Sequence, residues 1–181
     1  MADMKAGILQ TVGAPAQRFS EDFLRVLRAL RFAGQFGLSI ENETWQALLG
    51  AVSELSQLSP ERVQQEIMKV LSKACRPSIA LRLYLESGAL AALYPEIAEA
   101  AVGSGSESTR FVRALEVCDA LRPSRPLVRL AVLFSLVSLG RSKEGVGEDG
   151  VGWAVEGLMQ RLRFSNADIK RVRSVVVTHH I

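Results

Sequence analysis

Apolar residues recur at helical spacing along almost the whole chain from Ser20 onward. They repeat three and four positions apart, which places them on one face of an α-helix. No stretch after residue 20 alternates apolar and polar residues as a half-buried strand does. The pattern therefore predicts an all-α fold, a multi-helix, bundle-like arrangement in which each helix buries one apolar face.

Residues that favour helix ends divide this pattern into segments. Ser20 is expected to be the N-cap of the first long helix and Gly37 its C-cap. Ser59 and Pro60 are expected at the N-cap and first position of a later helix. The predicted helices cover residues 20–37, 43–55, 60–74 and 77–87, a short segment before Tyr94, and residues 109–120, 126–139, 151–163 and 166–179.

The first 19 residues lack a helical pattern, and Ile8 to Val12 is typical of a short strand. Because a single strand is not stable alone in water, we interpret it as the last piece of a sheet whose other strands are missing. The chain is thus expected to be a fragment. The glycine- and serine-rich residues 103–106 suggest a linker, which gives three expected parts: 1–19, 20–102 and 103–181.

Composition argues against membrane and secreted classes of protein. The longest apolar runs are too short to span a bilayer. The first residues include Asp3 and Lys5, and no apolar segment typical of a signal peptide follows them. The two cysteines, Cys75 and Cys118, lack metal-type spacing and are expected to be buried thiols. We therefore expect a cytoplasmic protein with no membrane partner.

The charge balance is mildly basic, with a formal net charge of +3. Arginine supplies 17 of the 22 basic residues, and its planar fork suits phosphates and bases. A GC-rich genome, which favours arginine codons, explains the bulk composition equally well. Composition alone therefore leaves nucleic-acid binding open.

The strongest functional lead is an ordered charged segment. Arg25, Arg28 and Arg31 follow one another at three-residue spacing, beside Glu21 and Asp22 on the expected helix. A carboxylate next to a guanidinium offers an acceptor and donors that match the Watson–Crick edge of cytosine or adenine better than that of uracil or guanine. The remaining guanidiniums suit phosphates. A solvated charged face with weak intrahelical pairs is the alternative.

Residues 5–13, 18–22 and 27–33 carry a family likeness, and residues 21–25 contain the motif E-D-x-x-R. Over residues 3–75 the chain resembles the neck of class II tRNA nucleotidyltransferases (CCA-adding enzymes) and bacterial poly(A) polymerases. The resemblance implies that residues 20–102 form a helical neck domain, with a nucleotide-reading helix at 20–37, and that residues 1–19 are the remnant strand and linker of a catalytic head.

The resemblance also implies a role for each charged residue of this segment. Asp22 and Arg25 would pair with the base of an incoming CTP or ATP. Arg28 and Arg31 would contact the nucleotide, and Glu21 would orient the neighbouring arginines.

A second family motif, E-R-(I/V)-x-x-E, begins at Glu61 and includes Arg62 and Glu66. In the family this helix start braces the nucleotide-reading helix, so the resemblance implies a supporting role. An ordinary amphipathic helix with Glu61 at its positive end is equally compatible with the sequence.

Residues 103–181 are expected to form a helical body domain with a degenerate His-Asp region. Residues 129–134 resemble the stretch before the metal-binding His-Asp pair of related phosphohydrolases, but Ser135 and Leu136 follow instead of that pair. His179 and His180 are expected to be structural or exposed, because adjacent helical residues point about 100° apart. The basic residues that could contact a tRNA backbone, with a solvated helix face as the alternative, are Arg161, Arg163, Lys170, Arg171 and Arg173.

The carboxylates for nucleotidyl transfer are missing from the sequence. That reaction uses two carboxylates that hold Mg²⁺, and the family supplies them from a D-x-D motif in the head domain. No D-x-D occurs in the 181 residues. The resemblance thus implies that Mg²⁺ acts in the parent enzyme through ligands outside this chain, and that the chain alone is inactive.

We therefore predict the neck and body of an RNA 3′-end nucleotidyltransferase, acting in tRNA CCA addition or poly(A) addition. Its expected partners are ATP or CTP, a tRNA or other RNA 3′ end, and the missing head domain. The alternatives are a non-catalytic helical RNA-binding module, whose arginine row contacts phosphates only, and a helical interaction domain that binds no nucleic acid.

Overall fold

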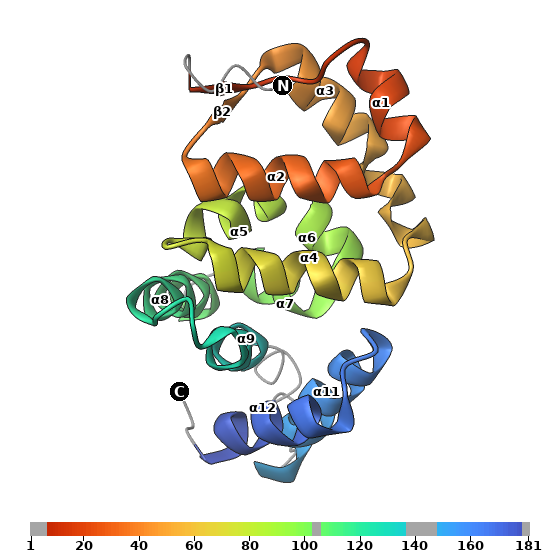
Figure 1. The fold of residues 1–181 in the computed structure, drawn as a ribbon. Helices are drawn as coiled ribbons and strands as arrows, with labels where there is room; N and C mark the ends of the chain where they lie inside the picture. Colours follow the sequence, from red (N-terminus) through yellow and green to blue (C-terminus); the bar gives the residue numbers. More distant parts are fainter. Residues whose placement is uncertain (1–6, 103–105, 137–147, 179–181) are drawn as a thin grey trace.

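A computed structural model describes residues 7–102, 106–136 and 148–178 of the chain, and Figure 1 shows that helices make up nearly all of this part. The all-α prediction is confirmed. The N-terminal part consists of β1 (Ile8–Leu9), α1 (Pro15–Glu21), α2 (Leu24–Phe36), β2 (Ser39–Ile40), α3 (Asn42–Ala51) and the 3₁₀ helix η1 (Val52–Gln57). The remaining helices are α4 (Pro60–Lys73), α5 (Pro77–Glu86), α6 (Ala89–Leu93), α7 (Pro95–Val102), α8 (Ser106–Ala120), α9 (Pro126–Phe134), α11 (Glu148–Arg161) and α12 (Asn166–Thr178).

The predicted N-terminal strand is shorter than expected and has a partner. It pairs in parallel with β2, so that Ile8 lies opposite Ser39 and Leu9 opposite Ile40. The amides of Ser39 and Glu41 donate to the carbonyls of residues 7 and 9, each at 3.0 Å. The expectation that every partner strand is missing from the chain was wrong, because a two-residue partner is too short to produce an alternating pattern in the sequence.

The expected helix over residues 20–37 is two helices. Pro15 occupies the first turn of α1, where its missing N–H costs nothing, so the prediction that residues 1–19 contain no helix was wrong. Ser20 lies in the last turn of α1 rather than at an N-cap. The chain breaks at Asp22, whose backbone is extended (φ −159°, ψ 104°), and α2 begins at Leu24. Gly37 is the predicted left-handed C-cap, at φ 64°.

Most other helix predictions agree with the structure within a few residues, but α7 was missed. No helix was predicted between Tyr94 and residue 109, whereas Pro95 begins α7 in this interval. Ser59 and Pro60 begin α4 as predicted. The glycines and charged residues of 141–152 predict a mobile loop, but α11 begins at Glu148, so that prediction is wrong for residues 148–152. Residues 141–147 lie outside the described part.

Helix α2 is held from two sides, by α5 and by α4, while α1 packs on α3 (Figure 1). Gly34 lets α2 and α5 approach closely. A Cβ atom at this position would lie 2.4 Å from the Cα of Ala80, which is well inside van der Waals contact. The position of α2 is therefore defined by backbone packing as well as by side chains.

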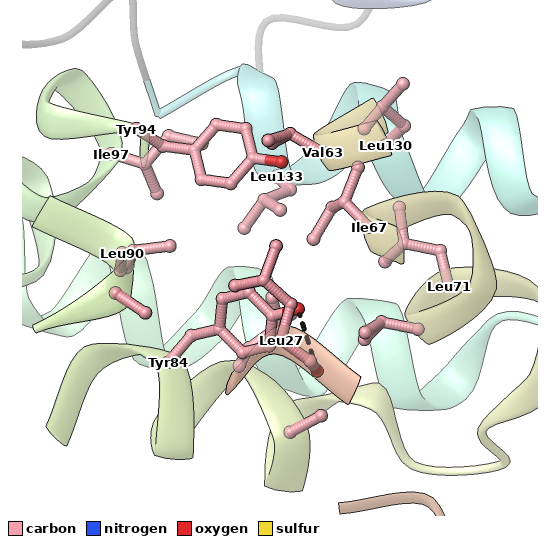
Figure 2. Close-up of a cluster of buried hydrophobic side chains, with 14 of the residues drawn as sticks. Leu27, Val63, Ile67, Leu71, Tyr84, Leu90, Tyr94, Ile97, Leu130 and Leu133 are labelled. Carbon is pink, nitrogen blue, oxygen red and sulfur yellow. Dashed lines mark hydrogen bonds between the residues drawn. The ribbon is translucent and has the colours of Figure 1, made fainter. Parts of the chain in front are cut away.

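A single hydrophobic core runs through the described residues from β1 to α12. Figure 2 shows its centre, where side chains of α2, α4, α5, α6, α7 and α9 meet. Leu130 and Leu133 of α9 lie beside Val63 and Ile67 of α4. The predicted division into neck and body at about residue 103 stays a prediction. The core is continuous on either side of that position.

Helices α11 and α12 pack on each other and form the end of the molecule opposite β1 and β2 (Figure 1). Helix α12 joins them to the rest through α9. None of the helices in the described ranges is long and apolar enough to cross a membrane.

Candidate functional site

The break between α1 and α2 places Asp22 at the centre of the candidate site. Its Oδ1 accepts a hydrogen bond from the backbone N–H of Leu24 at 3.1 Å, which caps the first turn of α2. Both carboxylate oxygens also accept from Nη2 of Arg62, at 2.9 and 3.0 Å. Asp22 is thus held by α4, and its side chain remains 28% exposed.

Arg25 pairs with Glu21 rather than with Asp22. Its Nη1 donates to Oε2 of Glu21 at 2.5 Å and to the backbone carbonyl of Arg18 at 2.7 Å. Nη1 of Arg18 also donates to Glu21, at 3.2 Å. Hydrogen bonds from the two guanidiniums lower the pKa of Glu21 below its usual value, and the bond from Arg25 has the larger effect. Glu21 therefore orients two arginines, as the resemblance implies for its family.

Asp22 and Arg25 keep complementary hydrogen-bonding capacity in this arrangement. Arg25 is 39% exposed, and its Nε and Nη2 donate to no described residue. Oδ2 of Asp22 accepts only from Arg62 among the described residues, so one of its lone pairs is available. An acceptor and a pair of donors thus lie three residues apart on the exposed side of the helix junction.

Glu66 of α4 lies close to the other two arginines of the row, Arg28 and Arg31. Its side chain is buried, and it accepts from Nε of Arg31 at 2.9 Å and from Nζ of Lys69 at 2.8 Å. Nε of Arg28 lies 3.8 Å away. Burial alone raises the pKa of Glu66. The hydrogen bonds from Lys69 and Arg31 outweigh that effect, so its pKa lies below the usual 4.5.

Arg31 and Arg28 differ in how much of each side chain solvent reaches. The side chain of Arg31 is only 10% exposed, donates also to Gln35 at 3.2 Å, and lies 4.1 Å from the ring centre of Phe32. That of Arg28 is 47% exposed. The row therefore presents Arg25 and Arg28 to solvent, and Arg31 connects α2 to α4.

The second motif braces α2 through two of its three charged residues. Arg62 holds Asp22 and Glu66 holds Arg31, while Glu61 is exposed in the first turn of α4. Sequence reasoning missed Arg18 and Lys69 as members of the site. Their signal is local: each lies three residues from a carboxylate, Glu21 and Glu66 respectively.

The basic residues of α11, of α12 and of the turn between them fall into two groups. Arg161 forms a two-pronged ion pair with Glu96, at 2.9 and 3.1 Å, and Arg173 pairs with Glu156 at 3.2 Å. The exposed residues of the second group form no ion pair with any described residue. They are Arg163, Lys170 and Arg171.

The described residues do not form a metal site. No group of three or more His, Cys, Asp or Glu side chains among them is arranged to hold an ion. Helix α9 ends at Phe134, where the related phosphohydrolases have their His-Asp pair. The prediction for His179 and His180 lies outside the described residues. Of the two cysteines expected to be buried, Cys118 is buried, but Cys75 is exposed just beyond the end of α4, so that prediction is wrong for Cys75.

A family model and curated sequences from bacteria match parts of this chain. A family model described as "Probable RNA and SrmB- binding site of polymerase A" matches residues 37–101, which extend from the end of α2 to α7. The chain is 44% identical over 71 residues to the CCA-adding enzyme of Leuconostoc mesenteroides, covering 39% of this chain and 18% of that enzyme. It is also 44% identical over 99 residues to the multifunctional CCA protein of Nitrosomonas europaea, covering 54% and 23%.

Solved structures share the fold over nearly the whole chain. A CCA-adding enzyme in complex with ATP matches 96% of this chain and 39% of its own, with a TM-score of 0.57 and 22% identity. A tRNA-processing enzyme in an apo form matches 96% and 46%, with a TM-score of 0.59 and 19% identity. The chain thus spans less than half the length of these solved relatives, and its match to the two curated ones covers less than a quarter of each.

Proposed function

Since the chain is related to the CCA-adding enzymes and poly(A) polymerases, we propose that it is the part of an RNA 3′-end nucleotidyltransferase that selects ATP or CTP and binds RNA. The observation that carries this proposal is the junction of α1 and α2. There Asp22 offers an acceptor and Arg25 offers donors, each fixed by a separate ion pair.

Fixed partners suit these two residues to recognise a base. Arg62 and Glu21 hold the carboxylate and the guanidinium before a nucleotide arrives, so little conformational entropy is lost on binding. An acceptor and donors match the amino group and ring nitrogen on the pairing edges of cytosine and adenine. Uracil and guanine present the reverse order at these atoms, which leaves polar groups unpaired.

The exposed Arg28 is the residue that we assign to the phosphates. Its guanidinium is about half exposed and lies one helical turn beyond Arg25. Arg31 is assigned a supporting role on α2, because its Nε and Nη1 donate to Glu66 and Gln35 and only 10% of its side chain is exposed. The rival function, an RNA-binding module that uses a free row of three arginines, is less well supported for the same reason.

The related enzymes imply Mg²⁺ for the transfer step. The described residues do not provide a ligand set for that ion. No step of nucleotidyl transfer is therefore assigned to residues of this chain, whose proposed contribution is to bind and orient the nucleotide.

Nucleotide selection is the measurement that tests this function. We expect the 181-residue chain to bind ATP and CTP about ten- to a hundredfold more tightly than GTP and UTP, the discrimination of one good bidentate base contact. Arg25→Ala should reduce that ratio to about one, because it removes the donors of the pair. Isothermal titration with each of the four nucleotides measures both effects.

Arg82→Ala is the matched control, since Arg82 is an exposed arginine of α5 with no ion pair to a described residue. It should retain the wild-type preference. Equal affinity for all four nucleotides in the wild type, or an unchanged preference in Arg25→Ala, would contradict base recognition at the α1–α2 junction.

A further inference from the structure

The molecule carries a large exposed aromatic side chain far from the α1–α2 junction. Trp153 of α11 is 62% exposed. The guanidinium of Arg173 from α12 lies 5.0 Å from the centre of its ring, within the range of a cation–π contact. Arg173 is fixed in turn by Glu156, at 3.2 Å. The indole is thus supported by a guanidinium while most of the residue faces solvent.

Two glycines near this indole, Gly152 and Gly157, leave space that side chains would otherwise fill. A Cβ atom at Gly152 would lie 2.9 Å from Nε of Arg173, so glycine leaves room for that side chain beside α11. Gly157 lies four residues beyond Trp153, and therefore on the same face of the helix. A Cβ atom there would have nothing within 4 Å. A flat group can therefore approach Trp153 without meeting a neighbouring side chain at position 157.

The positive charge at this end of the molecule lies on α12 and on the turn before it. Residues 162–178 contain four basic residues and one acidic one, whereas α11 itself contains three acidic residues and one basic one. Lys170 is exposed and lies three residues before Arg173, which makes the two neighbours on the surface of α12. A cation that forms no ion pair with a described residue thus lies near the supported indole.

We propose that Trp153 and Arg173 form a stacking platform for an unpaired base of single-stranded RNA, with Lys170 contacting an adjacent phosphate. An exposed aromatic ring together with a positively charged surface is the combination that binds single strands, since every base has a face that can stack. The site deepens the proposed function, on which it rests, by specifying how the C-terminal helices hold RNA.

Fluorescence tests the platform directly in the Trp45→Phe background, where Trp153 is the only tryptophan. Titration of the 181-residue chain with a short oligoadenylate should quench Trp153 emission. Inorganic polyphosphate should compete for the cations without quenching. Equal quenching by polyphosphate, or by an acidic polyglutamate peptide, would overturn the stacking platform.

Substitutions separate stacking from charge. Trp153→Ala should weaken oligoadenylate binding between about fivefold and a hundredfold, the range of one stacked base, and should leave the salt dependence unchanged. Lys170→Ala should reduce the salt slope by about one phosphate contact. Gly152→Ala keeps all charges but displaces Arg173, and should reduce the quenching. Circular dichroism verifies that each variant is folded.

The outcomes distinguish this platform from the nucleotide site at α2. Wild-type affinity for oligoadenylate in Trp153→Ala, or no RNA binding at low salt, would overturn the platform. Neither result would affect the nucleotide titrations, which test the preference for ATP and CTP and its loss in Arg25→Ala. Failure of that preference would in turn leave the quenching of Trp153 by oligoadenylate intact.

Discussion

Glu66 is the residue on which the ion pairs between α2 and α4 converge. It is buried beside Arg31 and Lys69 and remains ionised, because their hydrogen bonds offset the cost of burial. Removing its charge would leave Arg31 nearly buried without a carboxylate. With Arg31 in place, the charge of Glu66 thus stabilises the contact between α2 and α4 independently of any ligand.

The lowered pKa of Glu66 gives a pH prediction. A carboxyl group whose pKa is lower in the folded chain stabilises the fold above its unfolded pKa, and that stability is lost as pH falls through the folded pKa. We expect the free energy of unfolding to decline below about pH 4.5 in the wild type. Glu66→Gln should cost roughly 3 kcal/mol at pH 7 and should decline less on acidification. Urea denaturation from pH 7 to pH 3 measures both.

Glu116→Gln provides the comparison, because Glu116 is exposed on α8. It should follow the wild type across the whole pH range. If Glu66→Gln has the same stability and the same acid dependence as Glu116→Gln, then Glu66 does not hold α2 against α4 by its charge.

At the scale of elements, Arg129 of α9 ties together the ends of two other helices. It is fully buried, and its Nη1 donates to the carbonyls of Leu71 and Ala74 at 2.7 and 2.9 Å. Its other nitrogens donate to Cys75 and Leu121. These carbonyls lie at the C-terminal ends of α4 and α8, where helices lack internal donors and carry partial negative charge. A buried cation without a carboxylate is therefore satisfied by backbone alone.

Replacing Arg129 tests this arrangement. Arg129→Met fills a similar volume but leaves several buried carbonyls without donors, each worth about 1–3 kcal/mol. We expect a loss of at least about 3 kcal/mol in the free energy of unfolding, measured by urea denaturation at pH 7. Arg113→Met, at an exposed position of α8, should change stability by less than about 0.5 kcal/mol. Similar losses in the free energy of unfolding of the two variants would show that Arg129 does not hold the ends of α4 and α8 together.

Elements were predictable where a local signal marks them. Pro60 and Gly37 mark helix ends through their own backbone preferences, and both were placed correctly. The break at Asp22 was missed, because its acidic side chain serves equally well inside the first turn of a helix. Its contact with Arg62 joins residues 40 positions apart, which no local pattern encodes.

At the scale of the whole molecule, the proposed nucleotide and RNA sites lie at different ends of one continuous core. The α1–α2 junction belongs to the half with β1 and β2, whereas α11, the helix that contains Trp153, lies at the opposite end (Figure 1). The core between them includes side chains of α4 and α9 (Figure 2). The sequence indicated both basic segments. Only the fold shows that a packed interior separates them.

The whole chain is expected not to extend RNA by itself. Its 181 residues contain no D-x-D pair to hold Mg²⁺ between two carboxylates. The isolated chain should therefore add no labelled CMP or AMP to tRNA in the presence of Mg²⁺, whereas a CCA-adding enzyme in the same assay does so. Incorporation above the protein-free background would show that transfer carboxylates exist within these residues.

The pairing of β1 with β2 has a mechanical consequence. It closes residues 8–40 into a loop that contains α1 and α2, and only two residue pairs join the ends of this loop. A tension applied at the N-terminal segment would load these few bonds first, and they would yield before the helices behind them. Helix α2 would keep its position, because it packs against α5 and α4 independently of the strand. The β1–β2 pairing is thus the mechanically weak contact of this region, and the packing of α2 against α4 and α5 is the strong one.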